Sequence, residues 1–427
     1  MSKKITVDLG ELQENGILTE ETAAKIQAFY AVEGRSTSNR MTIAFSILGA
    51  MLVGLGIILI VGHNWDSFPR ALKISFSFLP ILIGQAACFY SLRNKRENAS
   101  WREGSAVFLF LSIGACIAMI SQIYNMEGSI SSFLLSWLLL CLPIVYLMRS
   151  TLASLLFLVG ITWYGADVSY GSNGVESWLF WLLYFSVFPF YYRLFREATF
   201  SNGFNVHSWV VAITFLIALG FLAVNLPVVM WLAYMSLLGI YFLLGAFFGF
   251  ERQKLLNNPY RVLGALGTLG IFFFASFDDY WKDIFPAGFS PLNVFSNVEF
   301  YISILLFGLA LYLLIGKGKW RDPMQLNPLS LGFIIYWMTF FIGGYSPLAA
   351  AILINILLLL SGLFYIRLGS HREHLGFLNL GLVIVTILII CRFFDADISF
   401  VLKGGLFVLL GLGFFFANYQ LLKKRAA

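Results

Sequence analysis

Three polar stretches at the ends of apolar segments hold the residues whose types could do chemistry. They are HNWDSFPRALK at 63–73, SQIYNME at 121–127 and RFFDADISFVLKGG at 392–405. Carboxylates can accept protons, and guanidinium groups bind phosphate and carboxylate oxygens. We predict a shared substrate-binding site at the outer, non-cytoplasmic face of the membrane that the chain spans. Its candidate residues are Asn64, Trp65, Asp66, Arg70, Lys73, Gln122, Tyr124, Glu127, Arg392, Asp395 and Lys403.

Each of these residues also has a simpler structural explanation. Tryptophans gather at membrane interfaces, so Trp65 needs no ligand. Gln122 and the in-span amides of Asn355 and Asn379 can serve as hydrogen-bonding contacts between helices. The prediction of a site therefore depends on the three stretches lying at one membrane level, and no catalytic role is assigned to any residue.

Other chemistry is not indicated by the sequence. The four cysteines all lie inside apolar runs, and the four histidines are scattered. The chain has no Ser/His/Asp arrangement, glycine-rich phosphate loop or metal-ligand spacing. We predict neither a metal nor a cofactor.

The composition decides which elements must position these residues. The chain has 427 residues, of which 59% are hydrophobic and 12% are charged. Soluble domains carry roughly 25% charged residues. Apolar runs of about 18–25 residues recur, and each is long enough to cross a bilayer as a helix. We predict an all-α fold, a polytopic bundle of membrane-spanning helices in contact with lipid.

The runs predict fourteen spans. Pro227 marks the break between two of them, because proline cannot continue a helix. The spans lie near 42–62, 72–92, 105–124, 131–148, 150–166, 177–193, 208–226, 229–250, 260–276, 298–316, 328–343, 347–367, 374–392 and 399–420.

The basic residues predict the topology. With the N-terminus inside, 23 of the 28 Lys and Arg residues fall on the cytoplasmic side. This agrees with the positive-inside rule. Both termini are then cytoplasmic. Because topology accounts for the net charge of +6, no nucleic-acid partner is indicated.

The chain also suggests an internal duplication. The stretch LGAMLVGLGIILIVGHNWDSFP at 48–69 resembles LGALGTLGIFFFASFDDYWKDIFP at 263–286. Parallel repeats occur in transporter folds. We divide the chain into a cytoplasmic helical hairpin at 1–41, a first unit at 42–193 (spans 1–6), inserted spans 7 and 8 at 194–258, and a second unit at 259–427 (spans 9–14).

Small residues recur at helical spacing in the first and ninth spans. They predict close approach of neighbouring helices. They are Ser46, Ala50 and Gly54, and Gly264, Gly267 and Gly270.

The N-terminal segment reads as two short helices broken at Asn15-Gly16. Thr19 is a candidate N-cap, followed by Glu20 and Glu21, which suit the positive end of a helix dipole. The hairpin either docks on the inner loops or binds a cytoplasmic protein partner through residues 1–40.

The chain resembles a bacterial family of predicted membrane proteins, domain of unknown function 2157. The resemblance rests on the helical N-terminal segment, a glycine-rich first span ending in Asn64-Trp65, the Gln122-Ile123-Tyr124 stretch, and Arg392 to Asp395 followed by Lys403-Gly404. It implies a multi-pass protein of the bacterial inner membrane. It implies no settled activity, so no catalytic residue is carried over.

Three functions remain open at this stage. We favour a transporter or flippase of a small polar solute or lipid-linked envelope precursor. A membrane-embedded glycan or lipid transferase, with Asp66 as general base, is the enzymatic alternative. The third is a non-catalytic sensor or scaffold that acts through the N-terminal hairpin.

Overall fold

The structure is a computed structural model of the whole chain. It describes residues 65–395, with gaps at 171–176, 198, 200, 224–225, 248–249, 251–253, 286–293, 296 and 317–326. It also describes isolated positions within 12–26 and 401–415. The predicted span 42–62 lies outside the described residues, as does nearly all of span 399–420.

The described part of the chain is all-α, as predicted. It holds fourteen α-helices and no strand. The helices are α3 (Arg70–Asn94), α4 (Ala99–Ile123), α5 (Ile130–Met148), α6 (Thr151–Tyr170), α7 (Ser177–Ser186), α8 (Phe188–Glu197), α9 (Asn202–Gly220), α10 (Met230–Leu244), α11 (Pro259–Ala275), α12 (Asp278–Ile284), α13 (Val298–Gly316), α14 (Pro328–Gly343), α15 (Pro347–His371) and α16 (Leu375–Asp395). Three short 3-10 helices, η1 (Trp65–Ser67), η2 (Pro227–Val229) and η4 (Leu255–Asn257), lie between them.

Each predicted span from 72–92 to 374–392 corresponds to a helix, but several bounds differ, and the helix of span 229–250, α10, already ends at Leu244. The span at 177–193 is two helices, α7 and α8, separated by a turn at Val187, two residues before Pro189. The span at 208–226 ends early, because α9 stops at Gly220 and tight turns follow. The predicted outer loop 277–297 contains the helix α12.

The chain divides into two compact units. One comprises Met1–Leu79 with Gln122–Asn125, and the other comprises Pro80–Ser121 with Met126–Ala427. The predicted halves and inserted spans remain a prediction.

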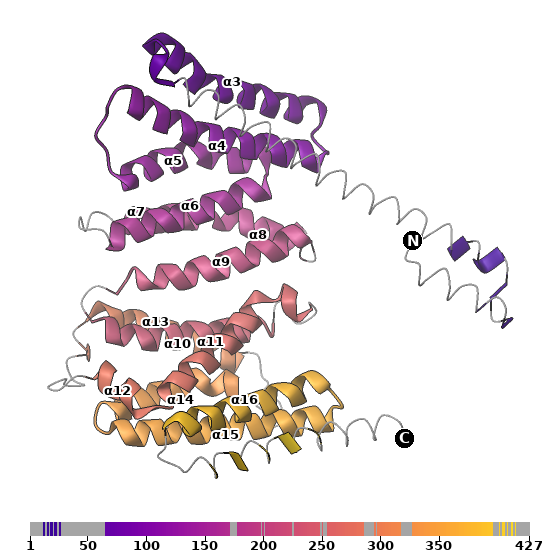
Figure 1. Cartoon of the computed structure of the whole chain (residues 1–427), viewed down its shortest axis with the longest axis vertical. Helices are drawn as coiled ribbons and strands as arrows, with labels where there is room; N and C mark the ends of the chain where they lie inside the picture. The colour runs from indigo at the N-terminus through magenta and orange to yellow at the C-terminus, as the bar shows by residue number, and fades with distance from the viewer. Residues whose placement is uncertain are drawn as a thin grey trace. The chain divides into compact units, whose positions relative to one another are not determined.

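In the second unit, the helices drawn in Figure 1 pack through side chains that form two large apolar cores. One core is built mainly by α4 to α9, and the other by α10 to α16. The helices α15 and α16 form a hairpin, in which Gly369 lies against Leu378 and Gly362 against Gly381. A Cβ atom on Gly369 would lie 2.3 Å from the Leu378 nitrogen, so only glycine permits this approach.

The helix α10 is the most enclosed element of the second unit. Twelve of its 15 residues are buried. It packs against α9, α11, α13 and α14. Its buried Ser236 hydroxyl donates to the Leu232 carbonyl and accepts the indole N–H of Trp337 at 2.9 Å. The apolar sequence of α10 therefore serves protein packing more than lipid contact.

Only some of the small residues predicted in the ninth span lie against a neighbouring helix. Gly264 and Gly267 face α10, where added Cβ atoms would meet Phe242 and Leu238. Gly270 has nothing within 4 Å of such an atom. The corresponding stripe of the first span, Ser46 to Gly54, lies outside the described residues.

The N-terminal segment is described at isolated positions of the first unit. Asn15 and Gly16 form a turn, and Gly16 has a φ of 71°. The Thr19 carbonyl accepts the Ala23 N–H at 3.0 Å. Lys25 pairs with Glu21 at 2.7 Å on the exposed side. The chain therefore breaks at Asn15-Gly16 as the sequence suggests, and residues 21–23 and 25–26 are helical.

Candidate functional site

In the first unit, two of the predicted polar stretches come together. The 3-10 turn at Trp65–Ser67 leads to Pro69, whose carbonyl accepts the N–H groups of Leu72 and Lys73 and so starts α3. The Lys73 ammonium lies 5.6 Å from the centre of the Trp65 ring. The Arg70 guanidinium lies 5.5 Å from the centre of the Tyr124 ring. These contacts place two cations over two aromatic faces.

Two further predicted residues, Gln122 and Glu127, are exposed. Gln122, at the end of α4, accepts the Asn125 N–H through its carbonyl at 3.3 Å. Asn125 has a φ of 48°, a left-handed conformation that ends the helix. Glu127 is exposed and belongs to the second unit. Asn64 lies outside the described residues, and only the backbone of Asp66 is described.

In the second unit, the predicted residue Arg392 lies at a sharp interruption between two helices. The helix α11 ends at Ala275, and α12 leaves it at an angle of 92°. Such a bend exposes the last carbonyls of α11, which need hydrogen-bond donors. Side chains supply them: the Ser276 hydroxyl donates to Phe273 at 2.7 Å, and the Trp281 indole donates to Ala275 at 2.8 Å.

A residue of α15, which comes later in the chain, supplies a further hydrogen-bond donor to the bend between α11 and α12. The amide of Asn355, on α15, donates to the Ser276 carbonyl and to the Ala351 carbonyl, both at 2.8 Å. Its Oδ1 atom is buried and has no hydrogen-bond partner among the described residues. Asn355 therefore ties α15 to the end of α11 and keeps one acceptor available.

Arg392, in the last turn of α16, lies beside the same residues. Its guanidinium carbon is 4.5 Å from the centre of the Phe277 ring, and Nη2 is 3.4 Å from the Ser276 hydroxyl oxygen. A cation is favourable at the negative end of a helix dipole, which here is the end of α11. We define Ser276, Phe277, Asn355 and Arg392 as the helix-break cluster.

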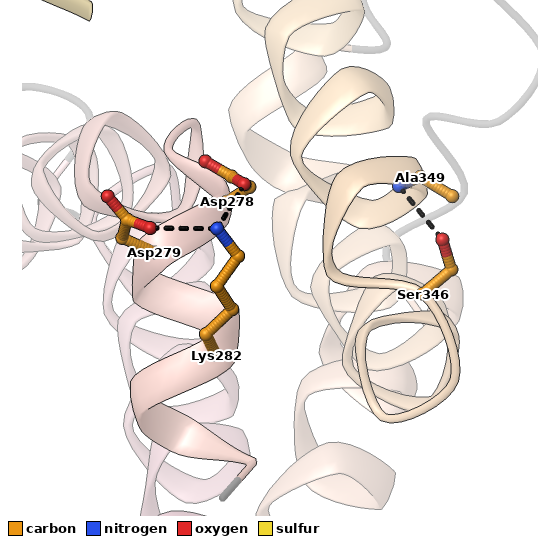
Figure 2. A network of polar contacts seen from close by, with 5 residues as sticks. All are labelled: Asp278, Asp279, Lys282, Ser346 and Ala349. Atoms are coloured by element: carbon orange, nitrogen blue, oxygen red, sulfur yellow. Dashed lines mark hydrogen bonds and ion pairs between the residues drawn. The ribbon is translucent and has the colours of Figure 1, made fainter. Parts of the chain in front are cut away.

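The short helix α12 carries exposed charges next to this cluster. Figure 2 shows Lys282 paired with Asp278 at 2.6 Å and with Asp279 at 2.9 Å. Beside them the Ser346 hydroxyl accepts the Ala349 N–H and caps α15. Water screens exposed pairs of this kind, so they contribute little to stability. The ion pairs lie on the solvent-exposed face of α12, while the buried side chains of Trp281 and Ile284 pack on its opposite face.

The structure thus groups the predicted residues in two places. Trp65, Arg70, Lys73 and Tyr124 meet in the first unit, and Arg392 meets the helix break in the second. Asp395 is described only by its backbone, and Lys403 lies outside the described residues. The sequence did not predict Ser276 and Asn355 as site residues, although Asn355 was visible as an amide within an apolar span.

These helices define the class of the protein. Eight described helices are long and apolar enough to cross a membrane, or nine if α11 and α12 count as one bent span. With their length and composition they make the chain a polytopic α-helical membrane protein. Among the described residues, no group of three or more His, Cys, Asp or Glu side chains is placed to hold a metal ion.

A family match agrees with this class. Residues 10–154 match the family described as "Predicted membrane protein (DUF2157)". The family resemblance predicted from the sequence is therefore confirmed over this part of the chain. The match does not reach Arg392 to Gly404. No curated protein and no solved structure matches the chain significantly.

Proposed function

We propose that the protein is a transporter or flippase that moves a small polar solute or a lipid-linked envelope precursor across a bacterial inner membrane. The observation that carries the proposal is the 92° interruption between α11 and α12. Irregular backbone at membrane depth is tolerated only where it is buried in protein or lines a water-filled cavity. Interrupted helices of this kind bind substrates and ions in many transporters.

The helix-break cluster supplies complementary groups for a polar substrate. The Arg392 guanidinium suits a phosphate or carboxylate. Among the described residues the Oδ1 atom of Asn355 has no hydrogen-bond partner, so it could accept a hydrogen bond from a hydroxyl or ammonium group of the substrate. Movement of one half of the chain against the other would then alternate access to the two sides.

The predicted topology fits this role. With both termini in the cytoplasm, the end of α11, the end of α16 and the Trp65 turn all fall on the outer side. The substrate would then be released or captured at the outer, non-cytoplasmic face of the inner membrane.

The test compares two asparagine variants in cells that lack the native protein. Asn355→Leu removes the amide at the helix break, and Asn379→Leu is the matched control, because Asn379 is exposed on α16. Envelope lipids and solutes are then measured on each side of the membrane. Transport predicts that an unmodified precursor or solute accumulates on one side with Asn355→Leu and not with Asn379→Leu.

Two other results would replace the proposal. Loss of a modified product with a normal precursor distribution would indicate a membrane-embedded transferase. A normal phenotype for Asn355→Leu, together with loss of function on deletion of residues 1–38, would indicate a sensor or scaffold. Equal amounts of the two variant proteins in the membrane, checked by immunoblotting, exclude a folding defect.

A further inference from the structure

Two tyrosine hydroxyls from different helices converge at the end of α9. A Cβ atom added to Gly220, the last residue of α9, would lie 2.9 Å from the Tyr170 hydroxyl oxygen and 2.9 Å from the Tyr234 hydroxyl oxygen. The two oxygens are therefore no more than twice that distance apart. Glycine leaves this position open, because any other residue would bring its side chain against both oxygens.

Neither of these hydroxyls holds another part of the fold in place. Among the described residues, no hydrogen bond joins the Tyr170 or the Tyr234 hydroxyl to another group. A tyrosine hydroxyl can both donate and accept a hydrogen bond. Tyr170 is 70% exposed, and Tyr234 is half-buried. The pair therefore offers two accessible polar groups to a ligand at one place on the second unit.

Aromatic rings adjoin the two hydroxyls. The Tyr170 ring packs edge-on against Phe221, with ring centres 5.7 Å apart. The centre of the Trp231 ring lies 6.4 Å from that of Tyr234, and Trp231 is 36% exposed. The face of an aromatic ring is its negative side, so it attracts the slightly positive C–H groups of a sugar. We define Tyr170, Gly220, Trp231 and Tyr234 as the two-tyrosine cluster.

Further aromatic contacts connect the two-tyrosine cluster to the bend between α11 and α12. The Trp231 ring lies edge-on to the Tyr280 ring of α12, with centres 5.8 Å apart. The Tyr280 hydroxyl is in turn hydrogen-bonded to the Tyr336 hydroxyl at 2.6 Å. The ends of α6, α9 and α11 all fall on the outer side in the predicted topology. A ligand bound at the two-tyrosine cluster would therefore lie on the same predicted side of the membrane as the helix-break cluster.

We propose that the two-tyrosine cluster binds a hexose ring, the sugar part of a lipid-linked envelope precursor. The Tyr170 and Tyr234 hydroxyls exchange hydrogen bonds with hydroxyls of the sugar, and the exposed Trp231 ring packs against its C–H groups. Ligand sites commonly combine aromatic side chains with a small number of polar groups. This inference rests on the proposed transport function, because it names the part of the substrate that the protein recognises.

A different tyrosine supplies the matched control. Tyrosine and tryptophan side chains also gather at membrane interfaces without any ligand. Tyr301 lies near the start of α13, is 62% exposed and falls on the same predicted outer side. Tyr301→Phe removes an exposed hydroxyl from that side and leaves the two-tyrosine cluster intact. An interface role alone predicts the same sugar binding for Tyr301→Phe as for the double variant Tyr170→Phe, Tyr234→Phe.

The test measures sugar binding by the full chain in nanodiscs of phosphatidylethanolamine and phosphatidylglycerol. The probes are glucose, galactose, mannose and N-acetylglucosamine, each followed by saturation-transfer difference NMR. The double variant keeps both rings and removes both hydroxyls. Because these hydroxyls form no hydrogen bond among the described residues, its helix content should be native, which circular dichroism checks. Gly220→Ala is a second variant, whose methyl group would displace the tips of two flexible side chains, and Gly270→Ala is its control.

We expect the native chain to bind at least one of the four sugars. The double variant should bind it about tenfold more weakly, because two hydrogen bonds are lost. Gly220→Ala should also weaken binding, while Tyr301→Phe and Gly270→Ala should bind as the native chain does. Binding of none of the four sugars by the native chain would overturn the proposal. So would native affinity in the double variant, or an equal loss in Tyr301→Phe.

Sugar binding and transport can fail separately in these experiments. Sugar binding in a chain whose Asn355→Leu variant behaves normally would keep the two-tyrosine cluster as a sugar site and remove the transport role of the helix-break cluster. Transport by a chain that binds none of the four sugars would keep the proposed function and remove the sugar site.

Discussion

The close contact between α10 and α11 gives the sharpest prediction. A Cβ atom added to Gly264 would lie 2.4 Å from the Phe242 nitrogen and 2.8 Å from the Leu238 oxygen. These are backbone atoms, which cannot rotate away as a side chain can. Gly264→Ala must therefore push the two helices apart, whereas Gly270→Ala, on the same helix, meets nothing within 4 Å.

The magnitude follows from two opposing effects. Alanine favours a helix over glycine by up to about 1 kcal/mol, and both variants gain this equally. Overpacking costs about 1–3 kcal/mol in a close-packed interior. A separation of about 0.5–1 Å forfeits a quarter to a half of each dispersion contact along the interface. The free energy of unfolding should therefore be about 1–3 kcal/mol lower for Gly264→Ala than for Gly270→Ala.

The assay is denaturant unfolding in one detergent, followed by tryptophan fluorescence of the purified full chain. The difference between the two variants isolates the contact, because propensity, length and detergent are shared. Equal stability of the two variants would refute the helix contact. So would a loss at Gly270 as large as the loss at Gly264.

Three further results are expected. Asn258→Ala should lower the free energy of unfolding by about 2–3 kcal/mol, because the buried Asn258 side chain caps α11 and also donates to two carbonyls. The control Asn98→Ala removes an exposed cap and should lower the same free energy by about 1 kcal/mol. The hydrogen bond from Arg193 holds the pKa of Glu197 below its usual range. The stabilisation from this pair is therefore complete above the ordinary carboxyl pKa and disappears as the pH falls through the lowered pKa. In Arg193→Gln, carboxyl NMR should show the pKa of Glu197 back in its ordinary range. A fluorescent reporter fused after Ala427 should be bright in the cytoplasm, and activity of a periplasmic reporter there would contradict the predicted topology.

The positions of the helices could be predicted because membrane spans obey a simple physical rule. A run such as 298–316 must be about 20 apolar residues long to cross the hydrocarbon core, and the helix α13 has those same bounds. Length and hydropathy are local properties of the sequence, so no partner needs to be known.

The interruptions within helices could be predicted less well. Pro189 was a visible signal that the span 177–193 could break. The end of α9 at Gly220 had no comparable signal. The bend at Ser276 depends on donors from Trp281 and Asn355, and the second of these lies 79 residues away. The hydropathy of a segment contains no information about contacts with residues so distant in the sequence.

The helix-break cluster shows the same limit. Arg392 was predicted from its charge at the end of an apolar run, but its neighbours Ser276 and Phe277 were not. The contact with Ser276 joins positions 116 residues apart. A single sequence holds the residue types of a site, while the packing of α11, α15 and α16 decides which of them meet.

The enclosure of α10 has a consequence for how the chain assembles during synthesis. Three of the helices that cover it, α11, α13 and α14, follow it in the sequence, and the last two leave the ribosome well after it. Until they arrive, the interior-facing side of α10, including the Ser236 hydroxyl, must face lipid or the insertion machinery. A nascent chain stalled before residue 298 should therefore be a substrate for membrane quality-control proteases, and release of the stall should restore resistance as α13 and α14 close around it.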